Sequence, residues 1–319
     1  MKQKFLVTGG NGFIGSAIVE MLLKEGNQVT ILDNIFRHKK KSFSNNQIEK
    51  KIKFINGNIC NYKQVLKSAK DIDTIIHLAY INGTKNFYLY PNDVIEVATK
   101  GLINVFDACK HYNIKEIYLA SSSEVYHHPL KIPTDENESL KIPDPYNPRF
   151  SYACGKILTE IYGISFAKFF KKLVIFRPHN VFGPNMGNEH VVPELINKIY
   201  NLKKNNLKIE GTGKETRSFI FIKDFVEAFK LILKKGKHKN IYNIGNEDEI
   251  LIQKLVYMIS KNLNKKINIS KGSLKKGGTI RRCPKITKLK KLGYNQNYSF
   301  QEGLNITIDW YKNSYEKEI

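Results

Sequence analysis

Near its start the chain reads Lys4-Phe5-Leu6-Val7-Thr8-Gly9-Gly10-Asn11-Gly12-Phe13-Ile14-Gly15, an apolar run that ends in glycines. The apolar run predicts a β-strand, and the helical spacing of apolar residues over 16–24 predicts a helix directly after the glycines. Gly9, Gly12 and Gly15 therefore lie in a turn between a strand and a helix. Glycines there permit a tight turn and let the backbone approach a pyrophosphate, which the free N–H groups of the helix attract. The stretch predicts a dinucleotide-binding site.

A carboxylate, Asp33, ends the second predicted strand, 28–33. Its distance from Gly15 is close to the roughly 20 residues expected for the acidic residue that binds an adenosine ribose. Asp33 would accept hydrogen bonds from two ribose hydroxyls and repel a 2′-phosphate, which favours NAD over NADP. Arg37 and the lysines at 39–41 leave the alternative open.

Short apolar stretches alternate with helical patterns along the first half of the chain. Strands are predicted at 4–8, 28–33, 53–55, 74–78, 116–120 and 172–177, and helices at 16–24, 94–109 and 150–171. Such alternation implies right-handed βαβ units and a parallel sheet. Residues 127–148 hold five of the ten prolines and predict an irregular excursion. Beyond it, shorter elements are predicted at 190–204, 217–222, 223–234, 240–244, 252–262 and 300–313.

This pattern predicts an α/β fold with a doubly wound parallel (Rossmann) sheet and a smaller, partly discontinuous C-terminal substrate domain. The NAD-binding domain is expected over 1–178 with about 222–250, and the substrate-binding domain over 179–221 and 251–319.

The chain has 319 residues and carries 52 Lys and Arg against 29 Asp and Glu, a formal net charge of +23. Such a charge suggests a nucleic-acid partner. However, 46 of the basic residues are lysines, spread along the whole chain without a basic arm. We therefore predict no nucleic-acid partner. The six arginines are informative because a guanidinium fork suits bidentate phosphate binding.

Other sequence features limit the location and the cofactors. No stretch approaches the roughly 18–20 apolar residues of a membrane span, and the apolar run after Lys4 is too short for a secretory signal. The four cysteines lie far apart and form no metal-binding or disulfide pattern. We predict a cytoplasmic protein with no membrane partner and no metal.

Tyr152 and Lys156 form a Tyr-x-x-x-Lys pair on the helix predicted after the proline-rich excursion. Residues four apart lie on one face of a helix. A lysine ammonium beside a phenol favours the phenolate and lowers the pKa of the tyrosine, which makes it a usable base near neutral pH.

Taken together, these motifs resemble an extended short-chain dehydrogenase/reductase and, within that superfamily, the nucleotide-sugar epimerases and dehydratases. The resemblance covers essentially the whole chain. Further matching segments are His77-Leu78-Ala79, Ser121-Ser122-Ser123-Glu124-Val125-Tyr126, 101–109, 177–184 and 211–219. The resemblance implies NAD as cofactor and a nucleotide-diphospho-sugar as substrate.

The resemblance also implies residue roles. Ser122 would bind the sugar O4, Tyr152 would remove its proton, and Lys156 would hold the nicotinamide ribose. The implied cofactor-binding set is Gly9, Gly12, Phe13, Ile14, Gly15, Asp33, Asn34, Asn58, Ile59, Leu78, Ala79, Tyr152 and Lys156. The implied substrate-binding set is Tyr80, Ser122, Ser123, Asn180, Arg217, Arg281 and Arg282. Asn58 replaces the usual Asp at the adenine, and Tyr80 replaces a usual small residue.

Glu124 bears on the reaction outcome. The resemblance implies Glu at this place in 4,6-dehydratases and UDP-glucuronate decarboxylases, and an uncharged residue in simple 4-epimerases. Chemically, a carboxylate there could remove the acidified C5 proton of a 4-keto sugar, whereas the alternative is a glutamate that only caps a loop. Epimerase and dehydratase outcomes stay open, with a decarboxylase third. An NADPH-dependent carbonyl reductase and a non-catalytic dinucleotide-binding regulator are further alternatives.

The nucleotide end of the substrate is assigned to arginines. Arg217 and the pair Arg281-Arg282 resemble the family's diphosphate clamp, with Asn180 as a further donor. The resemblance also implies a homodimer formed by the helices near 94–110 and at Tyr152. Apolar residues predicted for that interface are Val94, Val97, Ile103, Phe106, Ile157, Ile161, Ile164 and Phe169.

Overall fold

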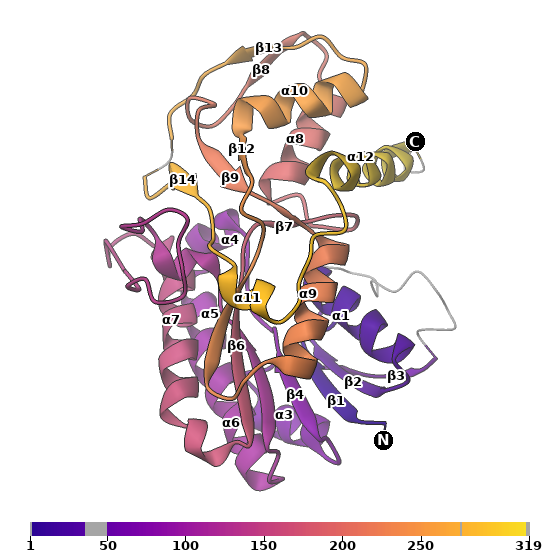
Figure 1. The fold of residues 1–319 in the computed structure, drawn as a ribbon, viewed down its shortest axis with the longest axis vertical. Coiled ribbons are helices and arrows are strands. Elements are labelled where there is room, and N and C mark those ends of the chain that lie inside the picture. Colours follow the sequence, from indigo (N-terminus) through magenta and orange to yellow (C-terminus); the bar gives the residue numbers. More distant parts are fainter. Residues whose placement is uncertain (1, 36–49, 275, 317–319) are drawn as a thin grey trace. The chain divides into compact units, whose positions relative to one another are not determined.

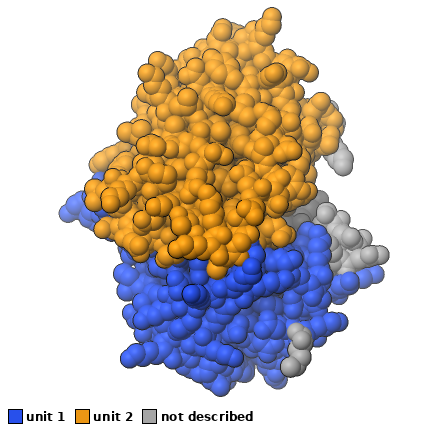
Figure 2. Space-filling view, viewed as in Figure 1, with its two compact units in different colours: residues 1–125, 140–177, 230–242 blue, residues 126–139, 178–229, 243–319 orange. Residues whose placement is uncertain are grey.

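The computed structural model describes residues 2–35, 50–274 and 276–316. Arg37 and the lysines at 39–41, which kept NADP open above, lie outside these residues. The described chain forms two compact units (Figure 2). Unit 1 contains residues 1–125, 140–177 and 230–242, and unit 2 contains residues 126–139, 178–229 and 243–319. These ranges differ from the predicted domains, whose assignment to cofactor and substrate stays a prediction.

A seven-stranded sheet forms the centre of unit 1 (Figure 1). Its strands are β1 (Lys4–Thr8), β2 (Gln28–Asp33), β3 (Ile52–Asn56), β4 (Thr74–His77), β5 (Glu116–Ala120), β6 (Lys172–Pro178) and β11 (Asn240–Ile244). They are ordered β11-β6-β5-β4-β1-β2-β3, and every pair from β6 to β3 is parallel. The order reverses between β1 and β4, the switch point where a doubly wound sheet binds its ligand. The predicted fold class is confirmed.

Helices connect these strands. They are α1 (Phe13–Lys24), α3 (Tyr62–Ala69), α4 (Thr84–Leu89), α5 (Pro91–Glu96), the π-helical turn η1 (Val97–Gly101), α6 (Leu102–His111), the 3₁₀ turn η2 (Ser123–Tyr126), α7 (Phe150–Ser165) and the 3₁₀ turn η3 (Ala167–Phe169). The excursion predicted at 127–148 contains no helix and only the single bridge Thr134–Pro284.

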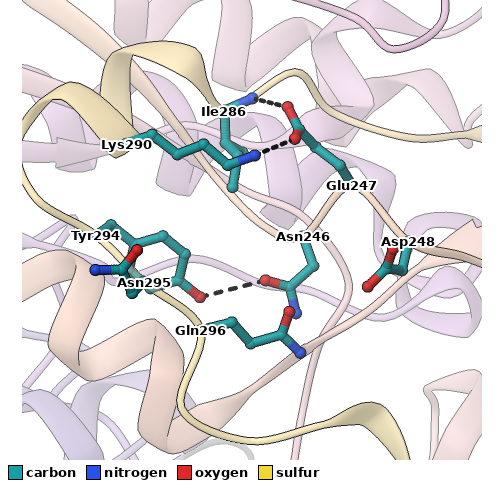
Figure 3. Close-up of a pocket in the computed structure, with 8 residues that line it drawn as sticks. All are labelled: Asn246, Glu247, Asp248, Ile286, Lys290, Tyr294, Asn295 and Gln296. Atoms are coloured by element: carbon teal, nitrogen blue, oxygen red, sulfur yellow. Dashed lines mark hydrogen bonds and ion pairs between the residues drawn. The ribbon is translucent and has the colours of Figure 1, made fainter.

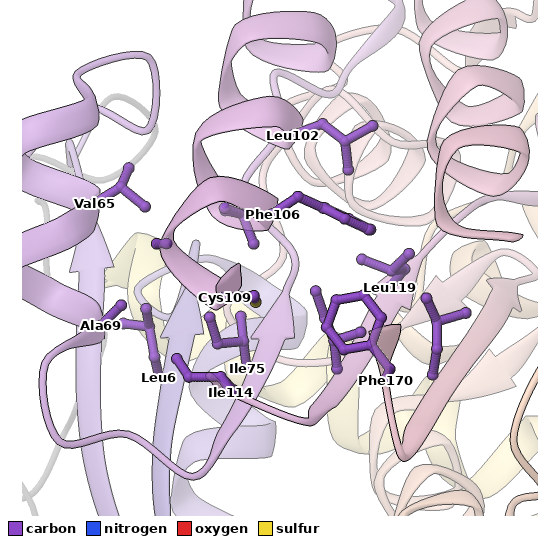
Figure 4. Packing of buried hydrophobic residues seen from close by; sticks show 14 of the residues in the cluster. Leu6, Val65, Ala69, Ile75, Leu102, Phe106, Cys109, Ile114, Leu119 and Phe170 are labelled. Carbon is purple, nitrogen blue, oxygen red and sulfur yellow. The ribbon is translucent and has the colours of Figure 1, made fainter. Parts of the chain in front are cut away.

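The two faces of the sheet are covered by different helices. Side chains of α3, α6 and α7 pack on one face, where Phe106 and Leu119 lie in a fully buried apolar cluster (Figure 4). Helices α1 and α9 (Ile222–Lys235) lie side by side, because Glu25, just after α1, pairs with Lys230 and Lys234 of α9. The Tyr118 hydroxyl of β5 donates to a carbonyl of α9. This burial of apolar side chains on both faces holds the strand ends in fixed positions.

Unit 2 is built from small sheets and helices. Its strands are β7 (Val181–Phe182), β8 (Asn206–Lys208), β9 (Thr216–Ser218), β10 (Ile220–Phe221), β12 (Glu249–Leu251), β13 (Asn268–Ser270) and β14 (Arg281–Arg282). Its helices are α8 (Val191–Tyr200), α10 (Ile252–Asn262), α11 (Thr287–Lys291) and α12 (Phe300–Glu316), of which α8, α10 and α12 pack together. The strand predicted at 217–222 is wrong as a single element, since β9 joins one sheet and β10 pairs with β7 in another.

Among the described residues, no helix is long and apolar enough to cross a membrane.

Candidate active site

The glycine turn follows β1 and enters α1. Gly9 has a positive φ of 72°, and a Cβ there would lie 2.8 Å from the backbone of Ala79. A Cβ on Gly15 would overlap the Gly9 carbonyl oxygen. Within the described residues no side chain caps α1 at Gly12. The turn therefore brings bare backbone and a helix N-terminus to the switch point, and this cradle fits a dinucleotide pyrophosphate.

Asp33, at the end of β2, orders the turn beside it. Its Oδ2 accepts a hydrogen bond from the Asn11 backbone N–H at 3.0 Å, and its Oδ1 accepts one from the Ile35 N–H at 2.8 Å. Each carboxylate oxygen can accept a second hydrogen bond. The geometry fits an NAD ribose, because the carboxylate is held in place and keeps acceptor capacity for hydroxyls.

Asn58 follows β3 and is tied to the chain around it. Its side-chain oxygen accepts from the Cys60 N–H at 2.9 Å, and its own N–H donates to Gln64. Ile59 is buried, and Asn104 donates to its carbonyl. The amide oxygen predicted to contact adenine therefore already has one partner, and its second lone pair is what an adenine amino group would use.

The end of β4 is fixed by Thr8. The Thr8 hydroxyl oxygen accepts from the N–H groups of Leu78 and Ala79, at 3.2 and 3.3 Å, and lies 2.8 Å from Nδ1 of His77. Burial, and secondarily the charge of Lys156, lowers the pKa of His77 to about 3. The imidazole is therefore neutral at physiological pH, so the Thr8 hydroxyl can donate to Nδ1.

Lys156 of α7 is fully buried near the end of β5. Its ammonium donates to the Ala120 carbonyl at 2.7 Å and lies 3.8 Å from the centre of the Tyr80 ring and 5.7 Å from that of Tyr152. Burial lowers the pKa of Lys156 to about 7, while the negative charge of Glu160 opposes this shift. The predicted Tyr/Lys pair thus lies on one face of a helix, next to the β5 strand end.

Tyr152 is buried among aromatic rings. It stacks on Phe87 with ring centres 4.9 Å apart, and the Tyr80 ring meets it edge-on at 5.1 Å. Burial raises the pKa of the Tyr80 phenol well above its ordinary value, and Tyr152 adds to this effect. Tyr80 therefore stays a neutral phenol. Tyr152 lies on the same face of α7 as the Lys156 ammonium.

The three serines after β5 have different neighbours. The Ser122 oxygen accepts from the Glu124 N–H at 3.2 Å, whereas Ser121 donates to Glu160 on α7. Ser123 is fully buried, and Glu124 is half-buried in η2. The structure thus separates Ser121, which bonds to α7, from Ser122, the residue predicted to contact substrate.

The sequence analysis did not predict Glu160, the partner of Ser121. Glu160 is buried on α7 and binds Arg177 of β6 through two hydrogen bonds, from Nε at 2.8 Å and Nη2 at 2.6 Å. Two signals were available: Glu160 lies one helical turn after Lys156, and Arg177 is one of only six arginines. This guanidinium fork binds a carboxylate inside unit 1.

Two predicted diphosphate ligands lie side by side in unit 2. Arg282 of β14 is directly opposite Arg217 of β9 in a parallel pair, so both side chains project from one face of the sheet. Arg217 donates to the carbonyls of Thr279 and Ile280, and Arg282 donates to the Thr279 hydroxyl. Both guanidinium groups therefore donate hydrogen bonds to the same short segment, residues 279–280.

Arg281 occupies the other face of the same sheet. It forms an ion pair with Glu249 of β12, with its Nη2 at 2.6 Å and its Nε at 2.9 Å from the carboxylate. Asn180, the further predicted donor, gives a side-chain hydrogen bond to the Ser218 carbonyl at 2.8 Å. The structure thus groups Arg217 with Arg282 and pairs Arg281 with an acid.

A small polar pocket of about 170 Å³ in unit 2 contains none of the predicted residues (Figure 3). Its lining residues are Asn246, Glu247, Asp248, Ile286, Lys290, Tyr294, Asn295 and Gln296. Glu247 pairs with Lys290 at 2.5 Å, and the Tyr294 hydroxyl donates to Asn246 at 3.2 Å. Because several of its polar groups already bond to one another and none belongs to the predicted site, we assign this pocket no part in the chemistry above. In the described parts of the chain, no three His, Cys, Asp or Glu side chains could together hold a metal ion.

Comparison with known proteins agrees with this geometry. The model of the NAD dependent epimerase/dehydratase family matches residues 5–245. The UDP-N-acetyl-alpha-D-glucosaminuronate decarboxylase of Bacillus cytotoxicus is 30% identical, over 98% of each chain. The dTDP-D-glucose 4,6-dehydratase of Dictyostelium discoideum is 33% identical over 78% of this chain and 59% of its own length.

Among solved structures, the UDP-N-acetylglucosamine 4-epimerase from Methanobrevibacter ruminantium M1, in complex with UDP-N-acetylmuramic acid, superposes with a TM-score of 0.87. It is 29% identical, and the match covers 98% of this chain and 100% of that one. The family match, the glycine cradle and the parallel sheet lead to one conclusion: the chain belongs to the NAD dependent epimerase/dehydratase family of extended short-chain dehydrogenases/reductases, and its cofactor is NAD.

Proposed function

We propose that the protein oxidises the C4 hydroxyl of a nucleotide-diphospho-sugar to a 4-keto intermediate and regenerates NAD within each turnover. The observation that carries the proposal is the Tyr152/Lys156 pair on α7, whose ammonium donates to Ala120, two residues before Ser122. The same ammonium contacts Tyr80, which follows the Ala79 backbone that lies against Gly9. Relatives named as epimerases, dehydratases and decarboxylases of nucleotide sugars support it.

In the proposed reaction each residue of this group has one task. Ser122 holds the sugar O4 by a hydrogen bond, and Tyr152 removes the O4 proton. Lys156 stabilises the resulting phenolate, because an ammonium buried beside the phenol acts through a low dielectric. NAD supplies the acceptor for the C4 hydride. Asp33 favours NAD over NADP and so argues against the NADPH-dependent reductase.

The reaction outcome is tested with a panel of substrates. Purified protein and NAD are incubated separately with UDP-glucose, UDP-N-acetylglucosamine, dTDP-glucose and a UDP-hexuronate, and the products are analysed by chromatography and mass spectrometry. An unchanged mass at a new retention time identifies an epimerase, loss of water a dehydratase, and loss of carbon dioxide a decarboxylase. If no nucleotide sugar is converted, the proposed function is wrong.

The dehydratase is a second candidate, which half-buried Glu124 beside Ser122 favours. We expect Glu124→Gln to leave C4 oxidation nearly intact but to stall the next step, because the amide cannot remove the C5 proton. Bound reduced cofactor should then accumulate and be visible by its absorbance. Glu138→Gln, at a half-buried glutamate of the excursion, is the matched control. A Glu124→Gln enzyme with wild-type turnover would leave Glu124 a loop-capping residue and favour the simple epimerase.

We also propose that Arg217 and Arg282, rather than Arg281, hold the substrate diphosphate. Their position on one face of the β9–β14 pair supports this choice, since a diphosphate is best bound by two adjacent fixed cations. Arg282→Lys should raise KM more than it lowers kcat, because the charge stays and the fork is lost. Arg281→Lys is the matched control and should change KM little. The opposite ranking in steady-state kinetics would exchange the two assignments.

A homodimer is proposed through α5, α6 and α7. Val94 and Phe106 are fully buried in unit 1 and cannot serve an interface, whereas Ile103 and Ile161 are 42% and 58% exposed. We expect Ile161→Lys to convert a dimer into a monomer of 36.8 kDa by light scattering, because burying an ammonium in an apolar interface is costly. Tyr257→Lys, on α10 of unit 2, should leave the mass unchanged. A wild-type protein that is monomeric at micromolar concentration would contradict the proposal.

The cytoplasmic location stays a prediction.

A further inference from the structure

Tyr80 directly follows Leu78 and Ala79, beyond the end of β4, and presents the face of its ring to Lys156. The Lys156 nitrogen is 3.8 Å from the centre of this ring, well within the distance at which a ring face attracts a cation. The same nitrogen donates to the Ala120 carbonyl. The buried ammonium is thus held between a carbonyl oxygen and an aromatic face.

The hydroxyl end of Tyr80 lies against helix α7. A Cβ on Gly155 would overlap the Tyr80 hydroxyl oxygen and would come within 2.5 Å of the Ala98 Cβ. Gly155 and Ala98, on α7 and the π-helical turn η1, therefore form a notch that receives the phenol. Within the described residues this buried hydroxyl has no hydrogen-bond partner. Steric fit to the notch, rather than a hydrogen bond, sets the orientation of the ring.

In the part of the chain that the structure describes, few other ionisable groups act on Lys156. Glu160 lies one turn away on α7 and favours the ammonium, whereas burial disfavours it. His77 of β4 is neutral, and the ring centre of Tyr152, on the same helix, lies 5.7 Å from the Lys156 nitrogen. Among the described residues, the Tyr80 ring and the Ala120 carbonyl are the groups in direct contact with the ammonium, and Glu160 acts on it from one turn away.

We propose that Tyr80 is a positioning residue for Lys156: its ring face holds the buried ammonium at the Ala120 carbonyl, and the notch of Gly155 and Ala98 locks the ring in that orientation. The proposal rests on the proposed function for its catalytic consequence. Because Lys156 stabilises the Tyr152 phenolate only while charged, Tyr80 would set the upper pH limit of C4 oxidation.

The direct test measures the pKa of Lys156 in cofactor-free protein by NMR titration of 13Cε-labelled lysines. A lysine that titrates near pH 7 stands apart from exposed lysines, which titrate above pH 10. Its signal is assigned by its loss in Lys156→Met. Burial also lowers the pKa of Lys172, and the signal of that lysine survives in the same variant.

Three variants separate the ring face from the hydroxyl and from aromatic bulk. Tyr80→Leu removes the face and should lower the pKa of Lys156 by about 0.5–1 unit, because the charged form loses its attraction to the ring. Tyr80→Phe keeps the face and should leave this pKa near the wild-type value. Phe87→Leu is the matched control, because Phe87 stacks on Tyr152 and not on Lys156. Tyr80→Met carries the test if Tyr80→Leu does not fold.

A second measurement follows the pH dependence of reduced-cofactor formation on the nucleotide sugar. In Tyr80→Leu the alkaline limb should move to lower pH by the same amount as the NMR pKa, and in Phe87→Leu it should stay. An unchanged pKa of Lys156 in Tyr80→Leu, or an equal shift in Phe87→Leu, would overturn the proposal. If the wild-type protein converts no nucleotide sugar, the proposed function fails, while the NMR titration still decides the role of Tyr80.

Discussion

Tyr152→Phe should abolish formation of the reduced cofactor on a bound nucleotide sugar, with a loss of about 10²–10⁴-fold in the single-turnover rate. The reason is that the phenol is the proposed acceptor of the O4 proton, and phenylalanine has no group that can take its place. The ring itself should stay stacked on Phe87, so binding of NAD by calorimetry is expected to change little.

Tyr162→Phe is the matched control for this loss. Tyr162 lies on the same helix, and its ring packs edge-on against Phe106 in the core, with ring centres 4.9 Å apart. Tyr162→Phe removes the same hydroxyl oxygen from a tyrosine that lies outside the proposed site. A Tyr152→Phe enzyme that reduces NAD at the rate of the Tyr162→Phe enzyme would remove Tyr152 from the chemistry.

Arg177→Met should lower the free energy of unfolding by about 3–5 kcal/mol, because it leaves the Glu160 carboxylate buried without its counter-charge. Both side chains of the pair are almost fully buried, at 2% and 4% exposure. Ser121 and Lys156 also depend on Glu160, the first by a hydrogen bond and the second by charge. Urea unfolding followed by circular dichroism gives the measurement.

Two controls make this result specific to the buried charge. Glu160→Met with Arg177→Met removes both charges and should recover much of the loss, since a buried ion pair is often replaceable by apolar side chains. Lys198→Met breaks the exposed Glu194–Lys198 pair and should cost less than about 1 kcal/mol. If Arg177→Met unfolds at the wild-type urea concentration, the pair makes no net contribution to stability.

The elements of unit 1 were largely predictable because their signals are local. The strands predicted at 4–8, 28–33, 116–120 and 240–244 are confirmed as β1, β2, β5 and β11 with the same bounds. Each is a short, largely apolar run that is followed by glycine or a polar residue, which is how a buried strand reads. The helix predicted at 252–262 is likewise confirmed as α10.

Where helices end was harder to predict. The helix predicted over 150–171 ends at Ser165 and is followed by the 3₁₀ turn η3. The amphipathic pattern continues through this turn, so periodicity alone does not reveal the break. Phe166 and Phe170 both pack against Phe106, with ring centres 6.0 and 5.4 Å apart. This long-range packing turns the chain into β6.

Local spacing is sufficient for the glycine turn, the acidic end of β2 and the Tyr152/Lys156 pair, because each depends on residues within a few turns of one element. Contacts between distant elements depend on strand register and burial instead. These place Arg282 rather than Arg281 beside Arg217, pair Arg177 with Glu160, and seat Tyr80 against Gly155. A one-residue change of register in β14 would exchange the two arginines between the faces of the sheet, and neither residue type nor spacing reveals that register.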